Sequence, residues 1–309
     1  MSKTAFVFPG QGSQVVGMGK DLYEKFDLAK DIYKRADEIM EMPLSKISFE
    51  GPSDILMQTH ITQPALFVHS YILTQLIGDK IKADATAGHS LGEYTSNVYS
   101  NSIDFENGLR LVKKRGELMK VSGVKRPGTM AALIGLNEIQ IDEICEKAKE
   151  HQIVEPANYN APGQIVISGD VEAVQRAMVI AKQDPYNSKL VKQLPVSGAF
   201  HSELMLTSSE ELRITIDKMD FKNADIPVYT NVEAEPVVNQ DIIKNSLFRQ
   251  LMASVKWQQL ITNMIVNMDV TKFYEIGSGK VLTGLIKRIA PDSELHNIGT
   301  TEDLLKYNL

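Results

Sequence analysis

The sequence predicts an α/β fold in which a mainly parallel sheet is covered by helices and a small second domain is inserted into the chain. In the first and last parts of the chain, short apolar segments alternate with longer amphipathic ones, a pattern typical of parallel sheets. Between them, residues 127–196 follow the order β-α-β-β-α-β, which is the ferredoxin-like arrangement. We therefore expect a discontinuous large domain of residues 1–126 and 197–309 around a ferredoxin-like small domain of residues 127–196.

The first part of the chain is expected to place a loop at the ligand-binding edge of the sheet. Its strands are short and apolar, and its helices repeat apolar residues every three or four positions. We expect strands at residues 4–8 and 83–87, and helices at residues 21–40, 63–77, 91–99 and 104–121. Pro9 and Gly10 end the first strand, so Gln11 falls at its carboxyl end, where open α/β sheets bind ligands.

The same spacings of apolar residues predict the strands and helices of the inserted domain and of the last part of the chain. In the insert we expect strands at residues 129–136, 153–159, 164–168 and 189–194, and helices at residues 138–150 and 171–182. After it we expect helices at residues 203–219 and 281–289, strands at 227–230 and 273–276, and a mostly helical segment at 246–268. Asp170 is the expected N-cap of the helix from residue 171, because a carboxylate can accept from the free N–H groups there.

Composition excludes several classes of function. The chain has 309 residues and a net charge of −6, which disfavours a general nucleic-acid-binding surface. No apolar run is long enough for a membrane span, and the start of the chain lacks a signal-peptide pattern. Cys145 is the only cysteine, so an internal disulfide is excluded and a reducing cytoplasm is expected. The six histidines lack metal-ligand spacing, and no metal is expected.

Residues 88–92, GHSLG, match the G-x-S-x-G pattern of a nucleophile elbow. A strand is expected before Ser90 and a helix after it, so the hydroxyl would lie near backbone N–H groups at the start of a helix. A nucleophile elbow between a strand and a helix predicts a hydrolase-like core for the large domain. The alternative is a glycine-flanked turn without chemistry, because so short a pattern also occurs by chance.

A nucleophilic serine needs a base. His89 is adjacent, but neighbouring side chains diverge in an extended segment. His201 lies in a loop of small residues directly after the inserted domain and is the better candidate. The alternative for His201 is a loop or capping histidine.

Five segments of the chain together resemble the malonyl-CoA:acyl carrier protein transacylases. They are FPGQGSQ at residues 8–14, TQPAL at 62–66, GHSLGEY at 88–94, GAFHS at 198–202 and EIGSGKVL at 275–282. They occur in the order and at the spacing of that family and extend over most of the chain. The resemblance implies the same fold, inserted domain included.

The resemblance also implies a catalytic role for several residues. Ser90 would carry the malonyl group as an ester, and His201 would act as general base and later as general acid. The backbone N–H groups of Gln11 and Leu91 would form the oxyanion hole. The backbone carbonyl of Gln250 would orient His201.

Other residues would bind the substrate. Arg115 would bind the free malonyl carboxylate through parallel N–H donors, with Arg110 on the same helix as the competing candidate. Gln63 and Asn160 would line the cleft. Phe200, directly before the histidine, goes with malonyl rather than methylmalonyl in related acyltransferase domains.

The expected activity is malonyl transfer from coenzyme A to the phosphopantetheine thiol of acyl carrier protein, serving fatty acid biosynthesis, with a specialised polyketide route as the alternative pathway. No bound cofactor is expected, since the coenzyme A thioester is a substrate and the phosphopantetheine belongs to the acceptor. The expected partner is acyl carrier protein, and we expect a cytoplasmic monomer that binds neither nucleic acid nor membrane. Two alternatives remain open: a serine esterase or thioesterase with the same elbow, and a non-catalytic carrier-binding protein.

Overall fold

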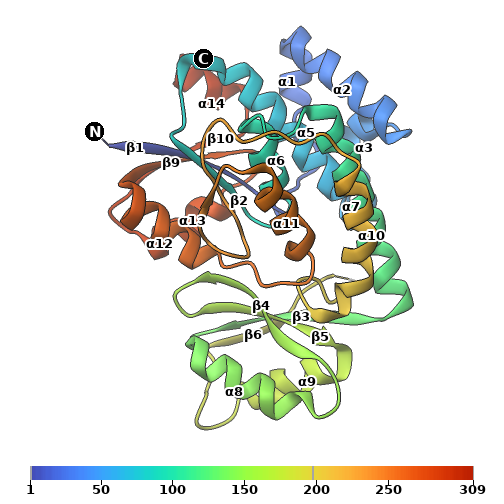
Figure 1. The fold of residues 1–309 in the computed structure, drawn as a ribbon, viewed down its shortest axis with the longest axis vertical. Coiled ribbons are helices and arrows are strands. Elements are labelled where there is room, and N and C mark those ends of the chain that lie inside the picture. Colours follow the sequence, from blue (N-terminus) through green and yellow to red (C-terminus); the bar gives the residue numbers. More distant parts are fainter. Residues whose placement is uncertain (1, 197, 309) are drawn as a thin grey trace.

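The computed structural model describes residues 2–196 and 198–308, which form two sheets and their covering helices (Figure 1). Met1, Ser197 and Leu309 lie outside the described residues. Met1 and Leu309 are the two ends of the predicted large domain, and Ser197 is the first residue of its second segment. The larger sheet has six strands in the order β10-β9-β1-β2-β7-β8, and the smaller has four in the order β4-β5-β3-β6. The predicted class, an α/β fold with a mainly parallel sheet and a ferredoxin-like addition, is confirmed, and the smaller sheet is antiparallel.

The large sheet is parallel except at one edge. Its strands are β1 (Lys3–Phe8), β2 (Ala85–Gly88), β7 (Val228–Tyr229), β8 (Pro236–Val237), β9 (Val270–Ile276) and β10 (Glu294–Ile298). Only the β7–β8 pair is antiparallel. Successive side chains of a strand point to opposite faces, and accordingly Phe6 and Phe8 belong to one hydrophobic core while Ala5 and Val7 belong to another. The sheet is thus buried on both faces.

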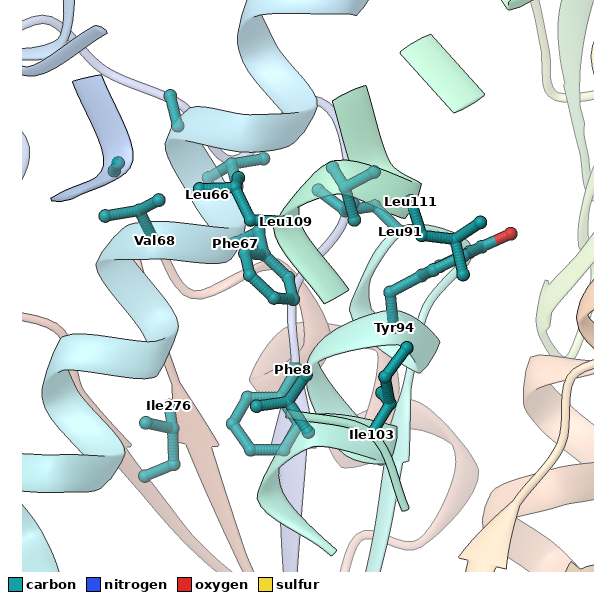
Figure 2. Packing of buried hydrophobic residues seen from close by; sticks show 14 of the residues in the cluster. Phe8, Leu66, Phe67, Val68, Leu91, Tyr94, Ile103, Leu109, Leu111 and Ile276 are labelled. Atoms are coloured by element: carbon teal, nitrogen blue, oxygen red, sulfur yellow. The ribbon is translucent and has the colours of Figure 1, made fainter. Parts of the chain in front are cut away.

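Helices from the first and last parts of the chain pack against this sheet or against one another. They are α1 (Lys20–Lys25), α2 (Asp27–Met40), α3 (Leu44–Glu50), α4 (Ser53–Leu56), α5 (Thr59–Ile77), α6 (Gly92–Tyr99), α7 (Phe105–Lys125), α10 (Leu206–Asp217), α11 (Gln240–Gln250), α12 (Trp257–Met268), α13 (Val281–Ile289) and α14 (Thr301–Lys306). Figure 2 shows one apolar cluster that contains Phe8 of β1, Phe67 of α5, Tyr94 of α6, Leu109 of α7 and Leu91, which directly precedes α6. This packing fixes α6, and with it the turn that precedes α6.

The small sheet lies to one side of the large one, with two helices on its outer face (Figure 1). Its strands are β3 (Gly128–Ile134), β4 (Val154–Ala161), β5 (Gln164–Asp170) and β6 (Leu190–Gln193), all antiparallel, and its helices are α8 (Glu138–Lys149) and α9 (Val171–Ile180). Ile141, Ile144 and Cys145 of α8 pack into its separate core. Asp170 does occupy the N-cap position of α9, but its carboxylate accepts from the backbone N–H of Ile153 at 2.8 Å instead of capping the helix.

One helical prediction was too long, and another segment is interrupted. Phe26 adopts an extended conformation and divides the expected helix at residues 21–40 into α1 and α2. The segment expected to be mostly helical, residues 246–268, contains the end of α11 and all of α12, with an interruption between Gln250 and Trp257. There, the Val255 N–H donates to the Ala157 carbonyl at 2.9 Å, beside β4. A contact this distant in sequence leaves no mark on local periodicity. Within the described residues, no helix is both long and apolar enough to cross a membrane.

Candidate active site

Ser90 lies on a tight turn between β2 and α6, with a positive φ of 50°. The two flanking glycines are required by close packing. A Cβ on Gly88 would lie 1.8 Å from the Gly92 carbonyl carbon, and a Cβ on Gly92 would lie 2.0 Å from the Phe8 carbonyl oxygen. Because no real Cβ tolerates such distances, the G-x-S-x-G pattern here follows from the geometry of the turn.

His201 reaches Ser90 from a loop 111 residues further along the chain. Its Nε2 lies 2.8 Å from Ser90 Oγ, and its Nδ1 lies 2.8 Å from the backbone oxygen of Gln250. A carbonyl oxygen only accepts, so Nδ1 carries the proton and the unprotonated Nε2 faces the serine hydroxyl. This is the tautomer that a general base needs.

Burial keeps His201 neutral. The side chain is 4% exposed, and desolvation, reinforced by the positive charge of Arg115, lowers the pKa of His201 to about 3. His89, the sequence neighbour of Ser90, instead places its Nε2 2.8 Å from Asn160 Oδ1. His201 therefore contacts the Ser90 hydroxyl, whereas His89 is engaged with Asn160.

Arg115, on α7, contacts the same serine. It is 1% exposed. One guanidinium nitrogen donates to Ser90 Oγ at 2.9 Å and Gln250 Oε1 at 3.0 Å, and the other donates to Gln63 Oε1 at 2.6 Å. These acceptors are all neutral oxygens, so a carboxylate that enters here would meet a buried cation. Arg110 is exposed and donates to Glu106 at 3.3 Å on the surface.

A cleft opens above Ser90, His201 and Arg115. Gln11 and Gln63 contribute polar side chains, Leu91 also lines the cleft, and an apolar wall completes it. The wall consists of Met119, Met130, Leu194, Val196 and Phe200. An acyl chain with a charged end and an apolar middle fits such a lining.

The backbone N–H groups of Gln11 and Leu91 lie at the ends of neighbouring parallel strands. Phe8 of β1 pairs with Gly88 of β2, so the loops that follow both strands leave the sheet at the same edge. Among the described residues, neither N–H has a hydrogen-bond acceptor. Both are available to an oxyanion that forms beside Ser90.

The expectation for Asn160 needs correction. Asn158 lines the cleft, whereas Asn160 is engaged with His89. The register of β4 against β5 shifts on both sides of this segment, and a bulge of this kind changes which side chains face a cleft. Gln63 does line the cleft, and it also holds Arg115.

Sequence reasoning missed Asn231. Its Oδ1 accepts from the Ser90 N–H at 2.7 Å, and its Nδ2 donates to the Gly88 carbonyl at 2.7 Å. Asn231 follows β7, the strand next to β2. A polar residue after a strand was the available signal, but the position of β7 beside β2 could not be read from the sequence. No group of three potential metal ligands occurs in the part of the chain described here.

Comparison with known proteins agrees with this geometry. The acyl transferase domain family matches residues 5–292. The malonyl CoA-acyl carrier protein transacylase of Bacillus subtilis is 43% identical over 94% of this chain and 91% of its own. A crystal structure of an acyl carrier protein S-malonyltransferase from Vibrio cholerae superimposes with a TM-score of 0.94 at 38% identity, covering 99% of both chains. A malonyl-transacylase solved in complex with its type II PKS acyl-carrier protein also gives a TM-score of 0.94, at 35% identity and 99% coverage of both chains.

Proposed function

The chain belongs to the acyl transferase domain family, among the malonyl CoA-acyl carrier protein transacylases, and from this premise we propose that it transfers malonyl groups between two thiols through an ester on Ser90. The donor is malonyl-CoA, and the acceptor is the phosphopantetheine thiol of acyl carrier protein. The observation that carries the proposal is the position of Ser90 Oγ, 2.8 Å from His201 Nε2 and 2.9 Å from the Arg115 guanidinium. One oxygen thus contacts both a base and a group that recognises carboxylates.

In the first half-reaction, His201 Nε2 takes the hydroxyl proton as Ser90 Oγ attacks the thioester carbonyl. The backbone N–H groups of Gln11 and Leu91 stabilise the oxyanion of the tetrahedral intermediate. The C–S bond then breaks, and the imidazolium returns its proton to the departing coenzyme A thiolate. Arg115 holds the malonyl carboxylate throughout.

The second half-reaction runs through the same groups in reverse. His201 takes the proton from the pantetheine thiol, whose sulfur attacks the Ser90 ester. When the C–O bond breaks, the proton returns to Ser90 Oγ. A neutral carbonyl, the Gln250 backbone oxygen, orients the imidazole where many hydrolases use a carboxylate. This arrangement stabilises imidazolium less, which thioester chemistry tolerates because thiolates leave readily.

The cleft supports the division of the chain into two parts. Ser90 and Arg115 come from the proposed large domain, whereas Met130 and Asn158 come from the proposed small domain of residues 127–196. The acyl group would therefore bind between them. The malonylated acyl carrier protein would then supply fatty acid biosynthesis. The cytoplasm is the expected compartment because the sequence has a single cysteine.

The direct test is to trap the ester. The protein is mixed with malonyl-CoA alone, quenched in acid, digested and examined by mass spectrometry. The peptide that contains Ser90 should gain one malonyl group, and the Ser90→Ala variant should gain none. An adduct that persists in Ser90→Ala, or its absence from the wild-type peptide, would contradict the proposal.

The discharge of that ester separates the transferase from the esterase or thioesterase alternative. Holo acyl carrier protein should remove the malonyl group much faster than water does. If water discharges the ester as fast as the carrier thiol, the hydrolase is the better description.

A further inference from the structure

Glu93 is a buried carboxylate directly behind the Ser90 turn, and the proposed chemistry does not use it. It lies in the first turn of α6 and is 0% exposed. Its Oε2 accepts from the backbone N–H of Asn231 at 3.0 Å and from Gln250 Nε2 at 2.8 Å. A carboxylate at a helix start ordinarily faces solvent or the free N–H groups of its own helix. Glu93 instead binds two residues far away in the sequence.

The side-chain amide of Gln250 connects Glu93 to the active site. Its Nε2 donates to Glu93 Oε2 and to the Ser90 backbone oxygen, both at 2.8 Å. Its Oε1 accepts from the Arg115 guanidinium at 3.0 Å. An amide has a donor end and an acceptor end, so acceptors on one side and a cationic donor on the other fix its orientation.

The same residue also orients the base through its backbone. The Gln250 carbonyl accepts from His201 Nδ1 at 2.8 Å. A rotated Gln250 amide would turn an N–H group toward the Arg115 guanidinium and an oxygen toward the Glu93 carboxylate. The contact with the guanidinium is repulsive, and the contact with Glu93 is repulsive while that carboxyl is ionised, so these partners hold the amide in its present orientation.

We propose that Glu93 is a positioning residue that fixes the Gln250 side-chain amide and, through it, aims Arg115 at the malonyl carboxylate. This inference rests on the proposed malonyl transfer and adds to it a residue that determines acyl selectivity without touching the substrate. Asn231, held by the same carboxylate oxygen, keeps the Ser90 backbone in place. Loss of Glu93 therefore impairs the transfer of malonyl, which needs Arg115, more than the transfer of acetyl, which has no carboxylate.

The test measures kcat/KM for malonyl-CoA and acetyl-CoA in the wild type, Glu93→Ala and Glu93→Gln. In Glu93→Ala we expect the malonyl-to-acetyl ratio to fall about tenfold or more, the size of effect expected when a hydrogen bond to a charged group is lost. Glu93→Gln should stay within about threefold of the wild-type ratio, because its amide oxygen still accepts both bonds. Should Glu93→Ala not fold, Glu93→Asp takes its place, since its shorter side chain withdraws the oxygen from Gln250.

A matched control is available in Glu275 of β9. It is equally buried at 1% exposed, and it accepts from Leu282 N at 3.1 Å and Thr283 N at 2.7 Å, in a different part of the fold. Glu275→Ala should lower the unfolding temperature and leave the malonyl-to-acetyl ratio unchanged.

Two failures can be told apart. A wild-type protein that transfers no malonyl group contradicts the proposed function. An active wild type combined with an unchanged ratio in folded Glu93→Ala or Glu93→Asp overturns the role of Glu93 alone, and so does a Glu93→Gln variant as impaired as Glu93→Ala.

Discussion

Replacing Arg115 by alanine should abolish the preference for malonyl over acetyl groups. A malonyl carboxylate offers two oxygens to the guanidinium, and each charge-assisted hydrogen bond contributes about 1.5 to 3 kcal/mol. Losing both therefore costs about 3 to 6 kcal/mol. At about 1.4 kcal/mol per tenfold in rate, kcat/KM for malonyl-CoA should fall by about two to four powers of ten.

Acetyl-CoA lacks the carboxylate and should lose much less. Its transfer is affected through the contact between Arg115 and Ser90 Oγ, at 2.9 Å, and through the positive charge of Arg115, which helps to lower the pKa of His201. The assay is steady-state transfer from each acyl-CoA to holo acyl carrier protein. Arg110→Ala is the matched control, because Arg110 lies on the same helix but pairs with Glu106 on the surface. An unchanged malonyl-to-acetyl ratio in folded Arg115→Ala would refute the reasoning.

The same variant should also change the pH dependence of acylation. The positive charge of Arg115 helps to lower the pKa of His201, and only neutral His201 can accept the serine proton. Without Arg115, the pKa of His201 rises toward its usual 6.5. The acidic limb of kcat/KM for acetyl-CoA should therefore move to higher pH. A limb at the wild-type position would show that Arg115 does not act on the base.

Three further predictions concern the turn, a buried carboxyl and the cleft. Gly92→Ala should strongly lower the unfolding temperature, because its Cβ would lie 2.0 Å from the Phe8 carbonyl oxygen. Gly284 on α13 has open space around it, so Gly284→Ala should stabilise the protein by about 0.5 to 1 kcal/mol. Equal effects of the two substitutions on thermal unfolding would contradict this contrast. Burial raises the pKa of Glu93 from 4.5 to about 7, so the folded protein holds that proton more tightly than the unfolded chain does. Its contribution to stability is complete below pH 4.5 and is lost as the pH rises to about 7. Denaturant unfolding should therefore show the wild type losing up to about 3 kcal/mol across this interval relative to Glu93→Gln, and parallel curves would disprove the titration. Phe200→Ser should raise kcat/KM for methylmalonyl-CoA relative to malonyl-CoA by opening the apolar wall, and a constant ratio would remove Phe200 from acyl selection.

The features predicted well from sequence depend on local physics. The turn at Ser90 is marked by glycines on both sides, and the structure gives each a steric reason. Helix α13, predicted at residues 281–289, has these bounds, because its apolar period is regular and a glycine-rich turn precedes it. Arg115 was chosen from the resemblance, with Arg110 as the competitor, and burial separates the two.

The features predicted poorly depend on contacts between distant segments. The break after Gln250 lets Val255 bridge to β4, where its N–H donates to the Ala157 carbonyl and its carbonyl accepts from the Tyr159 N–H. Asn160 was expected in the cleft, but a shift of strand register leaves that position to Asn158. Asn231 was not predicted at all, because it reaches the Ser90 backbone only through the position of β7 beside β2.

The sequence by itself determined the order of the elements, the turn that exposes Ser90 and the family to which the chain belongs. These follow from residue types and short spacings, which act within a few positions of the backbone. Only the tertiary structure decided that His201 approaches Ser90 from 111 residues away. It also decided that the acceptors of Arg115 are neutral oxygens, and that Glu93 accepts a hydrogen bond from Gln250. Packing brings remote side chains together and buries them. It therefore sets the pKa of the His201 base and the position of the Arg115 guanidinium beside Ser90.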